Sequence, residues 1–212
     1  MLAQGPWMPD QVDVRWHDEE YAPPAAATRE ADAAVAALVE RGSPAHDGLA
    51  ARLAGYRSGP ERLEMDLQPC RWALRLIDGE GACDSLTALC VVRTEDGRWL
   101  AGRRAAWLAS WPGRWALGAG GSVEVGESPA HTLARELEEE WSLVPERLTV
   151  EALLSLPTGL AMVVGLARVA ADAEAVPDAE HDEFAWWPAD PARWPAEADE
   201  GLRRVGQMLA AA

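Results

Sequence analysis

Apolar residues recur at helical spacing in one short segment of the chain. Between Ser128 and Trp141 they fall on one arc of roughly 100°, at Ala130, Leu133, Ala134, Leu137 and Trp141. Ser128 followed by Pro129 is a good helix start, because a serine hydroxyl caps the first turn and proline fits the first helical position. The pattern predicts a helix that buries this apolar face.

Apolar runs bounded by turn residues predict strands elsewhere. In the carboxyl-terminal part the predicted strands are residues 86–93, 99–103, 148–156, 161–169 and 184–187, with a closing amphipathic helix over 196–211. Toward the amino terminus we predict a helix over 28–41 and strands over 49–57, 62–67 and 70–77, with a break at Gln68-Pro69. Residues 1–27 are predicted to be irregular, 43–48 a turn and 78–84 a polar connection.

Strands mixed with one central and one terminal helix predict an α/β fold in which helices cover both faces of a sheet. A chain of 212 residues buries one good core and is too short for two large domains. We divide it into an extension of helix and small strands over residues 1–84 and a larger domain over 85–212.

Three carboxylates stand beside the apolar face of the predicted central helix. Glu136, Glu139 and Glu140 are spaced i, i+3 and i+4, so their side chains converge, whereas Glu138 points to solvent. Crowded like charges cost a helix a few tenths of a kcal/mol, and a divalent cation removes that cost. Hard oxygen ligands suit Mg²⁺ or Mn²⁺. A run of glutamates alone more often indicates a solvated face, but the residues before it favour a metal site.

The segment before the helix is strand-like and interrupted by glycines. Gly118, Gly120 and Gly121 allow a ligand to approach the backbone or allow positive φ. A bulge or tight turn is the other interpretation, and both can hold together. Glu127 and Arg135 are spaced to tie this loop to the helix by an ion pair.

Six of these residues fit the pattern G-x5-E-x7-R-E-U-x-E-E-x-G-U, where U is a bulky apolar residue: Gly121, Glu127, Arg135, Glu136, Glu139 and Glu140. The segment from Gly121 to Leu143 resembles the signature of the Nudix hydrolases, which cut nucleoside diphosphates linked to another group. Ser142 stands where the pattern has glycine, in an expected left-handed helix end, at a cost of about 1 kcal/mol.

The resemblance covers roughly residues 85–210 and implies the Nudix α/β/α sandwich with a mixed sheet. Residues 43–77 resemble, more faintly, an N-terminal strand module of some longer Nudix proteins. The resemblance also implies that Glu139 and Glu140 bind metal directly and that Glu136 joins them as a ligand or acts as general base. The Gly120 carbonyl would be a further ligand.

In the signature Arg135 accompanies Glu136 and Glu139, the residues expected to carry out catalysis, so we group the three as the catalytic set. We expect it to hold Glu127 rather than take part in the chemistry, and we expect Glu127 and Gly121 to support the site.

Family members often use a further carboxylate from a later loop. Glu180 and Glu183 are the candidates here, and a plain acidic turn is the alternative. His181 between them is expected to face solvent, as a lone loop histidine usually does.

Arginine and tryptophan side chains near the predicted site suit a nucleotide. Arg103 and Arg104 end a strand leading toward it, and arginine makes planar, bidentate phosphate contacts; surface charge at a strand end is the alternative. Trp111 is a candidate for stacking on a base or sugar. Packing in the core or a lid is the alternative for it and for Trp107 and Trp115.

Composition limits partners and location. A net charge of −16 repels nucleic acid backbones, so an anionic small molecule needs metal and arginine. No apolar run approaches the ~20 residues of a membrane span, and no signal peptide is evident. The cysteines show no metal-site spacing and suit reduced thiols. We expect a cytoplasmic protein with no nucleic acid or membrane partner. Its first 84 residues would bind substrate, cover the sheet or form a homodimer.

The predicted function is Mg²⁺-dependent hydrolysis, with Mn²⁺ as substitute, of a nucleoside diphosphate linked to a group X. The products are a nucleoside monophosphate and X-phosphate; ADP-ribose, a UDP-sugar, a dinucleotide or a damaged nucleotide would fit. A non-catalytic nucleotide sensor is the alternative, although a sensor need not keep the carboxylates. An isopentenyl diphosphate isomerase ranks lower, because that chemistry uses a cysteine and Cys90 lies in a predicted buried strand.

Overall fold

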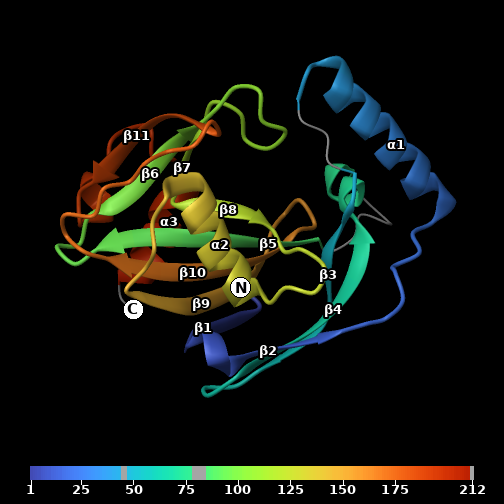
Figure 1. The fold of residues 1–212 in the computed structure, drawn as a ribbon, viewed down its shortest axis with the longest axis horizontal. Helices are drawn as coiled ribbons and strands as arrows, with labels where there is room; N and C mark the ends of the chain where they lie inside the picture. The colour runs from blue at the N-terminus through green and yellow to red at the C-terminus, as the bar shows by residue number, and fades with distance from the viewer. Residues whose placement is uncertain (44–46, 78–84, 211–212) are drawn as a thin grey trace.

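Two helices cover opposite faces of a mixed eight-stranded sheet in the computed structural model, which describes residues 1–43, 47–77 and 85–210 (Figure 1). The order along the sheet is β1 (Ala3–Trp7), β9 (Arg147–Ser155), β10 (Ala161–Val169), β5 (Leu86–Thr94), β6 (Trp99–Arg104) and β11 (His181–Trp187). Strands β10 and β5 are parallel, and the other pairs of the sheet are antiparallel.

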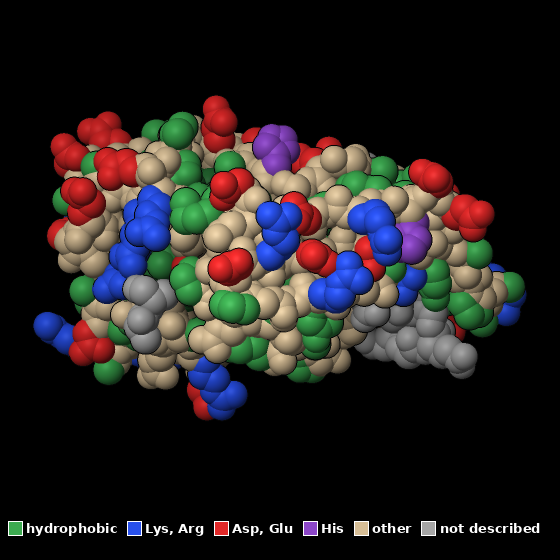
Figure 2. Space-filling model, turned by 90° about the horizontal axis from the view of Figure 1, so that it is seen from below, with side chains coloured by type: hydrophobic (Ala, Val, Ile, Leu, Met, Phe, Trp, Pro, Cys, Tyr) green, Lys and Arg blue, Asp and Glu red, His purple; other side chains and the backbone are tan. Residues whose placement is uncertain are grey.

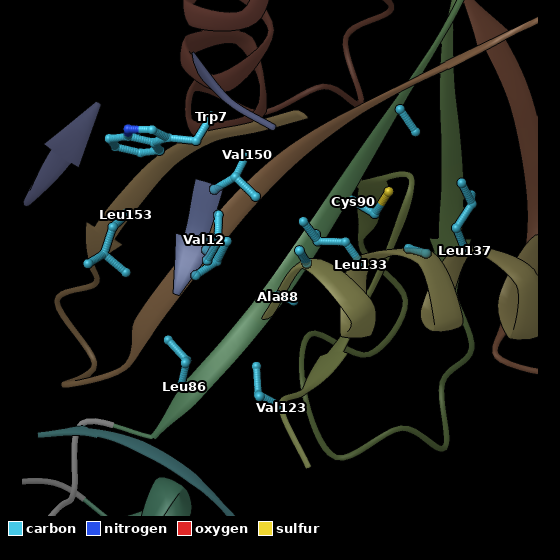
Figure 3. Close-up of a cluster of buried hydrophobic side chains, with 14 of the residues drawn as sticks. Trp7, Val12, Leu86, Ala88, Cys90, Val123, Leu133, Leu137, Val150 and Leu153 are labelled. Carbon is cyan, nitrogen blue, oxygen red and sulfur yellow. The ribbon is translucent and has the colours of Figure 1, made fainter. Parts of the chain in front are cut away.

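The core has two parts, one on each face of the sheet. Helix α2 (Pro129–Trp141) lies in front of the sheet in Figure 1, and α3 (Glu200–Ala210) lies behind it. Successive residues of β5 alternate between the two sides, as strand geometry requires: Ala88 and Cys90 pack with α2, and Val91 packs with α3. Figure 3 shows Leu133 and Leu137 of α2 beside this strand. The predicted α/β/α sandwich with a mixed sheet is confirmed.

The sheet forks between β5 and β6. These two strands are in register only at Arg93 and Trp99 and then diverge. Strand β8 (Ala119–Ser122) continues beside β5, and β7 (Trp115–Leu117) continues beside β6. Gly118 joins them with φ +57°, and a Cβ there would lie 1.9 Å from the Cys90 carbonyl oxygen. Glycine is therefore required where the fork turns.

A small N-terminal module packs beside the helix α2. It has a three-stranded sheet in the order β2 (Val12–Trp16), β4 (Leu63–Arg71) and β3 (Leu49–Ser58), followed by the 3₁₀ helix η2 (Trp72–Leu76). Helix α1 (Ala25–Glu40) lies beyond this sheet (Figure 1). Leu63, Met65 and Leu67 of β4 share the core on the α2 side, and the Ala51 N–H donates to the Val123 carbonyl at 2.8 Å. The N-terminal module and the larger domain thus bury a common core.

The prediction that residues 1–27 are irregular was wrong. They form β1, the 3₁₀ turn η1 (Pro9–Gln11), β2 and the start of α1. Strand β1 pairs with β9 and buries Ala3 and Trp7. Strands of only five residues carry little periodicity of their own, so distant pairing partners decide them.

The strand predicted over residues 70–77 was also wrong. Strand β4 runs through Pro69 to Arg71, and residues 72–76 form η2. The Pro69 carbonyl accepts from the Tyr21 N–H at 2.8 Å, beyond the last pair of β2 with β4 at Trp16 and Leu67. Proline is tolerated there because no ladder partner needs its missing N–H.

The other predicted elements of residues 28–210 are present with shifted ends. The first helix begins at Ala25, and the closing helix begins at Glu200 rather than at residue 196. The connection predicted over 78–84, residues 44–46 of the predicted turn and Ala211 lie outside the described residues. No helix in the part that is described has the length and apolar character to cross a membrane.

Opposite charges lie side by side on the molecular surface. Figure 2 shows arginine side chains next to carboxylates on the face seen there. Exposed ion pairs include Arg15 with Asp66 at 2.7 Å and Arg114 with Asp199 at 2.5 Å. Such pairs each contribute about 0–1 kcal/mol, so they soften the repulsion of the net charge of −16 without deciding stability.

Candidate active site

Helix α2 begins and ends as its sequence predicts. The Ser128 hydroxyl accepts from the His131 N–H at 3.2 Å, and Pro129 occupies the first turn. Ser142 adopts φ 53° and ψ 34° at the other end, in the left-handed region. Serine costs about 1 kcal/mol there relative to glycine, and the position lies outside the acidic face of the helix.

Arg135 holds the loop before α2 against the helix. Its Nε lies 2.9 Å from Glu127 Oε1, and its Nη1 lies 2.9 Å from Glu136 Oε1 and 3.0 Å from Glu139 Oε2. Burial alone would raise the pKa of Glu127, but hydrogen bonds from Arg135 and Thr132 outweigh it and lower the pKa below its usual value. The predicted ion pair of Glu127 with Arg135 is therefore present.

Glu140 is the most deeply placed carboxylate of the helix. Its relative exposure is 4%, and its Oε1 accepts from the Gly120 N–H at 3.0 Å. Its buried Oε2 has no hydrogen-bond partner within the described residues. Burial raises the pKa of Glu140 to about 9, with further contributions from Glu136 and Glu180. One buried oxygen of Glu140 therefore has no hydrogen bond among the described residues, and His181 Nε2 lies 3.6 Å from it.

Glu136 lies against the next glycine. A Cβ on Gly121 would stand 2.0 Å from Glu136 Oε1, so only glycine leaves room for this carboxylate. Burial is the main reason that the pKa of Glu136 is raised, and the charges of Glu139 and Glu180 add to it against the influence of Arg135. The Gly120 N–H thus binds Glu140, and the space beside Gly121 holds the Glu136 carboxylate.

Glu139 lies apart from these two groups. Its side chain is 59% exposed and pairs with Arg135, and it does not line the adjoining cavity. The structure therefore brings Glu136 and Glu140 together and leaves Glu139 at the rim. Glu138 is exposed, as its helical position predicts.

A cavity of about 570 Å³ opens at the fork of the sheet. Its polar lining includes Glu136, Glu140, Glu180, Arg104 and residues 118–122. The loop after β6 contributes residues 107–111 to the remaining lining. Strand β5 contributes Thr87, Ala88 and Leu89. Ligand sites commonly measure about 300–1,000 Å³, so this volume suits a nucleotide.

Arg103 and Arg104 at the end of β6 have different neighbours. Arg104 lines the cavity with Glu180; its Nη2 lies 3.5 Å from Glu180 Oε2, and its Nε donates to the Ser110 carbonyl at 3.1 Å. Arg103 pairs with Glu183 at 3.5 Å, and neither lines the cavity. Successive strand residues face opposite sides, so of these pairs only Arg104 and Glu180 reach the site.

The prediction that His181 faces solvent was wrong. Its side chain is 1% exposed, with Nε2 3.6 Å from Glu140 Oε2 and Nδ1 3.4 Å from Asp178 Oδ1. Its ring lies 4.3 Å from the Trp141 ring, centre to centre. Burial lowers the pKa of His181, although Asp178 opposes this. No local pattern marks the residue, because its place depends on Gly102 of β6, where a Cβ would lie 2.4 Å from the imidazole.

The tryptophans near the cavity divide into two kinds. Trp107 and Trp111 are 41% and 47% exposed and line the cavity. Trp115 is half-buried, with its ring 5.4 Å from that of Trp187. Trp115 is therefore a packing residue, and Trp111 remains available to a ligand.

The donor set fits a hard divalent cation. Within residues 1–43, 47–77 and 85–210, no three His, Cys, Asp or Glu side chains already form a coordinating group. However, Mg²⁺ needs only one or two protein carboxylates, because it keeps several waters and takes substrate phosphates. Glu136 and Glu140 supply hard oxygens, and Oε2 of Glu140 has no hydrogen bond among the described residues. Burial raises the pKa of Glu140, and the charges of Glu136 and Glu180 add to this. A cation would offset each of these costs.

The metal-free protein is expected to lose stability as the pH rises. Glu140 has a pKa of about 9 in the fold and about 4.3 when unfolded. Between these values the unfolded chain has released a proton that the folded chain keeps, so the free energy of unfolding falls with pH. Thermal unfolding in EDTA should give a lower Tm at about pH 8.5 than at about pH 5.5.

Glu140→Gln is the matched control for that measurement, because glutamine cannot ionise. In this variant the Tm should fall less between the two pH values. In the wild type, added Mg²⁺ should also reduce the fall, because it favours the charged carboxylate. A wild-type Tm that rises over this pH range would contradict the conclusion that burial raises the pKa of Glu140.

Comparison with known proteins identifies the family. The NUDIX domain model matches residues 85–209, which contain α2, the fork and the cavity carboxylates. The chain belongs to the Nudix family. Nudix family members are pyrophosphohydrolases. The N-terminal module, by contrast, lies outside the matched Nudix range, and no curated protein matches the chain.

Solved Nudix structures resemble the chain at low sequence identity. The NUDIX domain of Shewanella oneidensis NrtR, complexed with ADP ribose, is 22% identical, with a TM-score of 0.49 over 60% of this chain and 87% of that one. A C. elegans Ap4A hydrolase is 18% identical, with a TM-score of 0.47 over 60% and 96%. A MutT/nudix family protein from Enterococcus faecalis is 24% identical, with a TM-score of 0.43 over 49% of this chain and only 43% of its own length.

Proposed function

We propose that this Nudix chain hydrolyses a nucleoside diphosphate linked to a second moiety, giving a nucleoside monophosphate and a phosphorylated product. The observation that carries the proposal is the buried Glu140 carboxylate, held by the Gly120 N–H at 3.0 Å at the wall of a nucleotide-sized cavity. Glu136 lies beside it, and Arg104 lines the same space. ADP-ribose and a UDP-sugar are the substrate types that we favour, and the proposed location is the cytoplasm.

Glu136 and Glu140 would hold Mg²⁺, or Mn²⁺ in its place, with the Gly120 carbonyl and Glu180 as further ligands. Glu139 would join from the rim, and Glu183 is the weaker candidate because it lies with Arg103 outside the cavity. When bound, the cation neutralises the charge that develops on the phosphates.

The protein side chains position the substrate and the water. Glu136, fixed by Arg135 at 2.9 Å, would accept the proton of a water whose oxygen attacks phosphorus. The bond from that phosphorus to the bridging oxygen breaks, and the second phosphate leaves with its substituent. Arg104 would bind phosphate oxygens, and the exposed Trp111 would stack on the base or sugar. Glu127 supports this arrangement through Arg135.

Cys90, the candidate nucleophile of the isomerase alternative, is unsuited to that role. Cys90 has 0% exposure and packs in the core beneath α2, and it does not line the cavity. Burial raises the pKa of its thiol far above the usual value, which suppresses the thiolate. We therefore retain hydrolysis, with nucleotide sensing as the second candidate because Glu139 does not line the cavity.

A substrate panel tests the proposal. ADP-ribose, UDP-glucose and diadenosine tetraphosphate are incubated with the protein and Mg²⁺, and phosphate is measured after phosphatase treatment. At least one should be cleaved, and EDTA should abolish cleavage until Mg²⁺ is restored. Hydrolysis that continues unchanged in EDTA would refute the metal role. Binding without turnover, insensitive to EDTA, would favour the sensor.

A further inference from the structure

The N-terminal module forms part of the cavity wall. Trp72 and Arg75 of η2 line the cavity opposite residues of the Nudix domain. A second connection holds the loop after β6, because the Ser43 hydroxyl donates to the Trp107 carbonyl at 2.8 Å. Ser43 is 8% exposed, so this contact is built into the packing. The module therefore lines part of the cavity and also holds a loop that lines it.

Arg75 is attached to the end of β8, the strand that adjoins the carboxylates of α2. Its Nη1 donates to Ser122 Oγ at 2.6 Å, and Ser122 follows Gly121, whose backbone adjoins the Glu136 carboxylate. The guanidinium carbon lies 5.5 Å from the centre of the Trp72 ring. A guanidinium over an aromatic ring is held by a cation–π interaction, so Trp72 gives Arg75 a fixed orientation at the wall.

The negative charges that line the cavity favour a further arginine to bind an anionic substrate. Glu136, Glu140 and Glu180 all line it, and Arg104 is paired with Glu180 at 3.5 Å. A cation on the acidic helix and Arg104 on β6 would meet a diphosphate from two directions. Arg75, anchored to the last residue of β8, would meet it from the other branch of the fork. Arginine suits this role because its planar donors match phosphate oxygens in pairs.

Building on the proposed function, we propose that Arg75 binds a phosphate of the diphosphate substrate and that Trp72 positions its guanidinium. The N-terminal module thereby completes the Nudix site within a single chain. The diphosphate lies across the fork, between Arg75 beside β8 and Arg104 on β6. Residues outside the matched Nudix range thus contribute directly to substrate affinity.

Binding and kinetics of Arg75 variants test this inference. The dissociation constant of ADP-ribose, and separately of UDP-glucose, is measured by calorimetry in EDTA and in Mg²⁺, alongside KM and kcat. Arg75→Gln should raise Kd and KM about tenfold, equivalent to about 1.4 kcal/mol, with a smaller change in kcat. Arg75→Lys should restore part of the affinity. Arg57→Gln, in the same module but away from the cavity, should bind within about twofold of the wild type.

A purely structural role for Arg75 gives a different result. Ser122→Ala removes the hydrogen bond to Arg75 and keeps the cation, so it should weaken binding less than Arg75→Gln. Equal losses in these two variants, or an unchanged Kd in Arg75→Gln, would overturn the inference. Tm measurements establish that each variant is folded.

The binding measurement separates this inference from the proposed function. Arg75-dependent binding without turnover would support the inference and defeat the hydrolase proposal. Turnover with unchanged KM in Arg75→Gln would support the hydrolase proposal and defeat the inference about Arg75. Failure of the wild type to bind or cleave any nucleotide of the panel would defeat both.

Discussion

Replacing Glu140 by glutamine is expected to lower kcat/KM by about a thousandfold while the fold is kept. Glutamine has nearly the same shape, and its oxygen can still accept from the Gly120 N–H, which lies 3.0 Å from Glu140 Oε1. It removes the negative charge that Glu140 would carry with Mg²⁺ bound, next to an Oε2 that has no hydrogen bond among the described residues. Steady-state hydrolysis of the best panel substrate in Mg²⁺ measures the loss.

Glu138→Gln is the matched control, because Glu138 is on the same helix and exposed; it should keep near-normal activity. Glu139→Gln tests the resemblance independently. A direct ligand at this position implies a loss of about several hundredfold, whereas its 59% exposed side chain places it at the rim. Near-normal activity of Glu139→Gln would refute its assignment, and activity of Glu140→Gln within about tenfold of wild type would refute the central role of Glu140.

Gly121→Ala is expected to lower kcat by about a hundredfold or more with little change in Tm. The new Cβ would fall 2.0 Å from Glu136 Oε1, so the carboxylate must move away. A flexible side-chain end moves at small cost in stability, but a displaced base or ligand costs activity, since misplacement by about 1 Å is enough for such losses. Activity and thermal unfolding are measured on the same preparation.

Gly118→Ala is the informative contrast. Its Cβ would meet the Cys90 carbonyl oxygen at 1.9 Å, in a backbone with φ +57°, so the main chain itself must move and Tm should fall. A Gly121→Ala variant that keeps full activity would show that the Glu136 position seen here is not required. A variant that loses Tm as much as Gly118→Ala would show that backbone, rather than Glu136, gives way.

The sequence by itself determined helix α2 and the residues attached to it. The Ser128 cap, the left-handed end at Ser142 and the pair of Glu127 with Arg135 all follow from residues close together in the chain. Helical spacing repeats every few residues and needs no distant partner. The buried strands of the Nudix domain were also predicted, because long apolar runs specify them locally.

Only the tertiary structure decided which polar groups meet. It divided the predicted carboxylate trio, because Gly120 and Gly121 of β8 receive Glu140 and Glu136 and leave Glu139 at the rim. It buried His181 because β11 pairs with β6 beside Gly102. It formed β1 from residues expected to be irregular and placed η2 at the cavity. Such contacts join residues far apart in the chain, and no local periodicity records them.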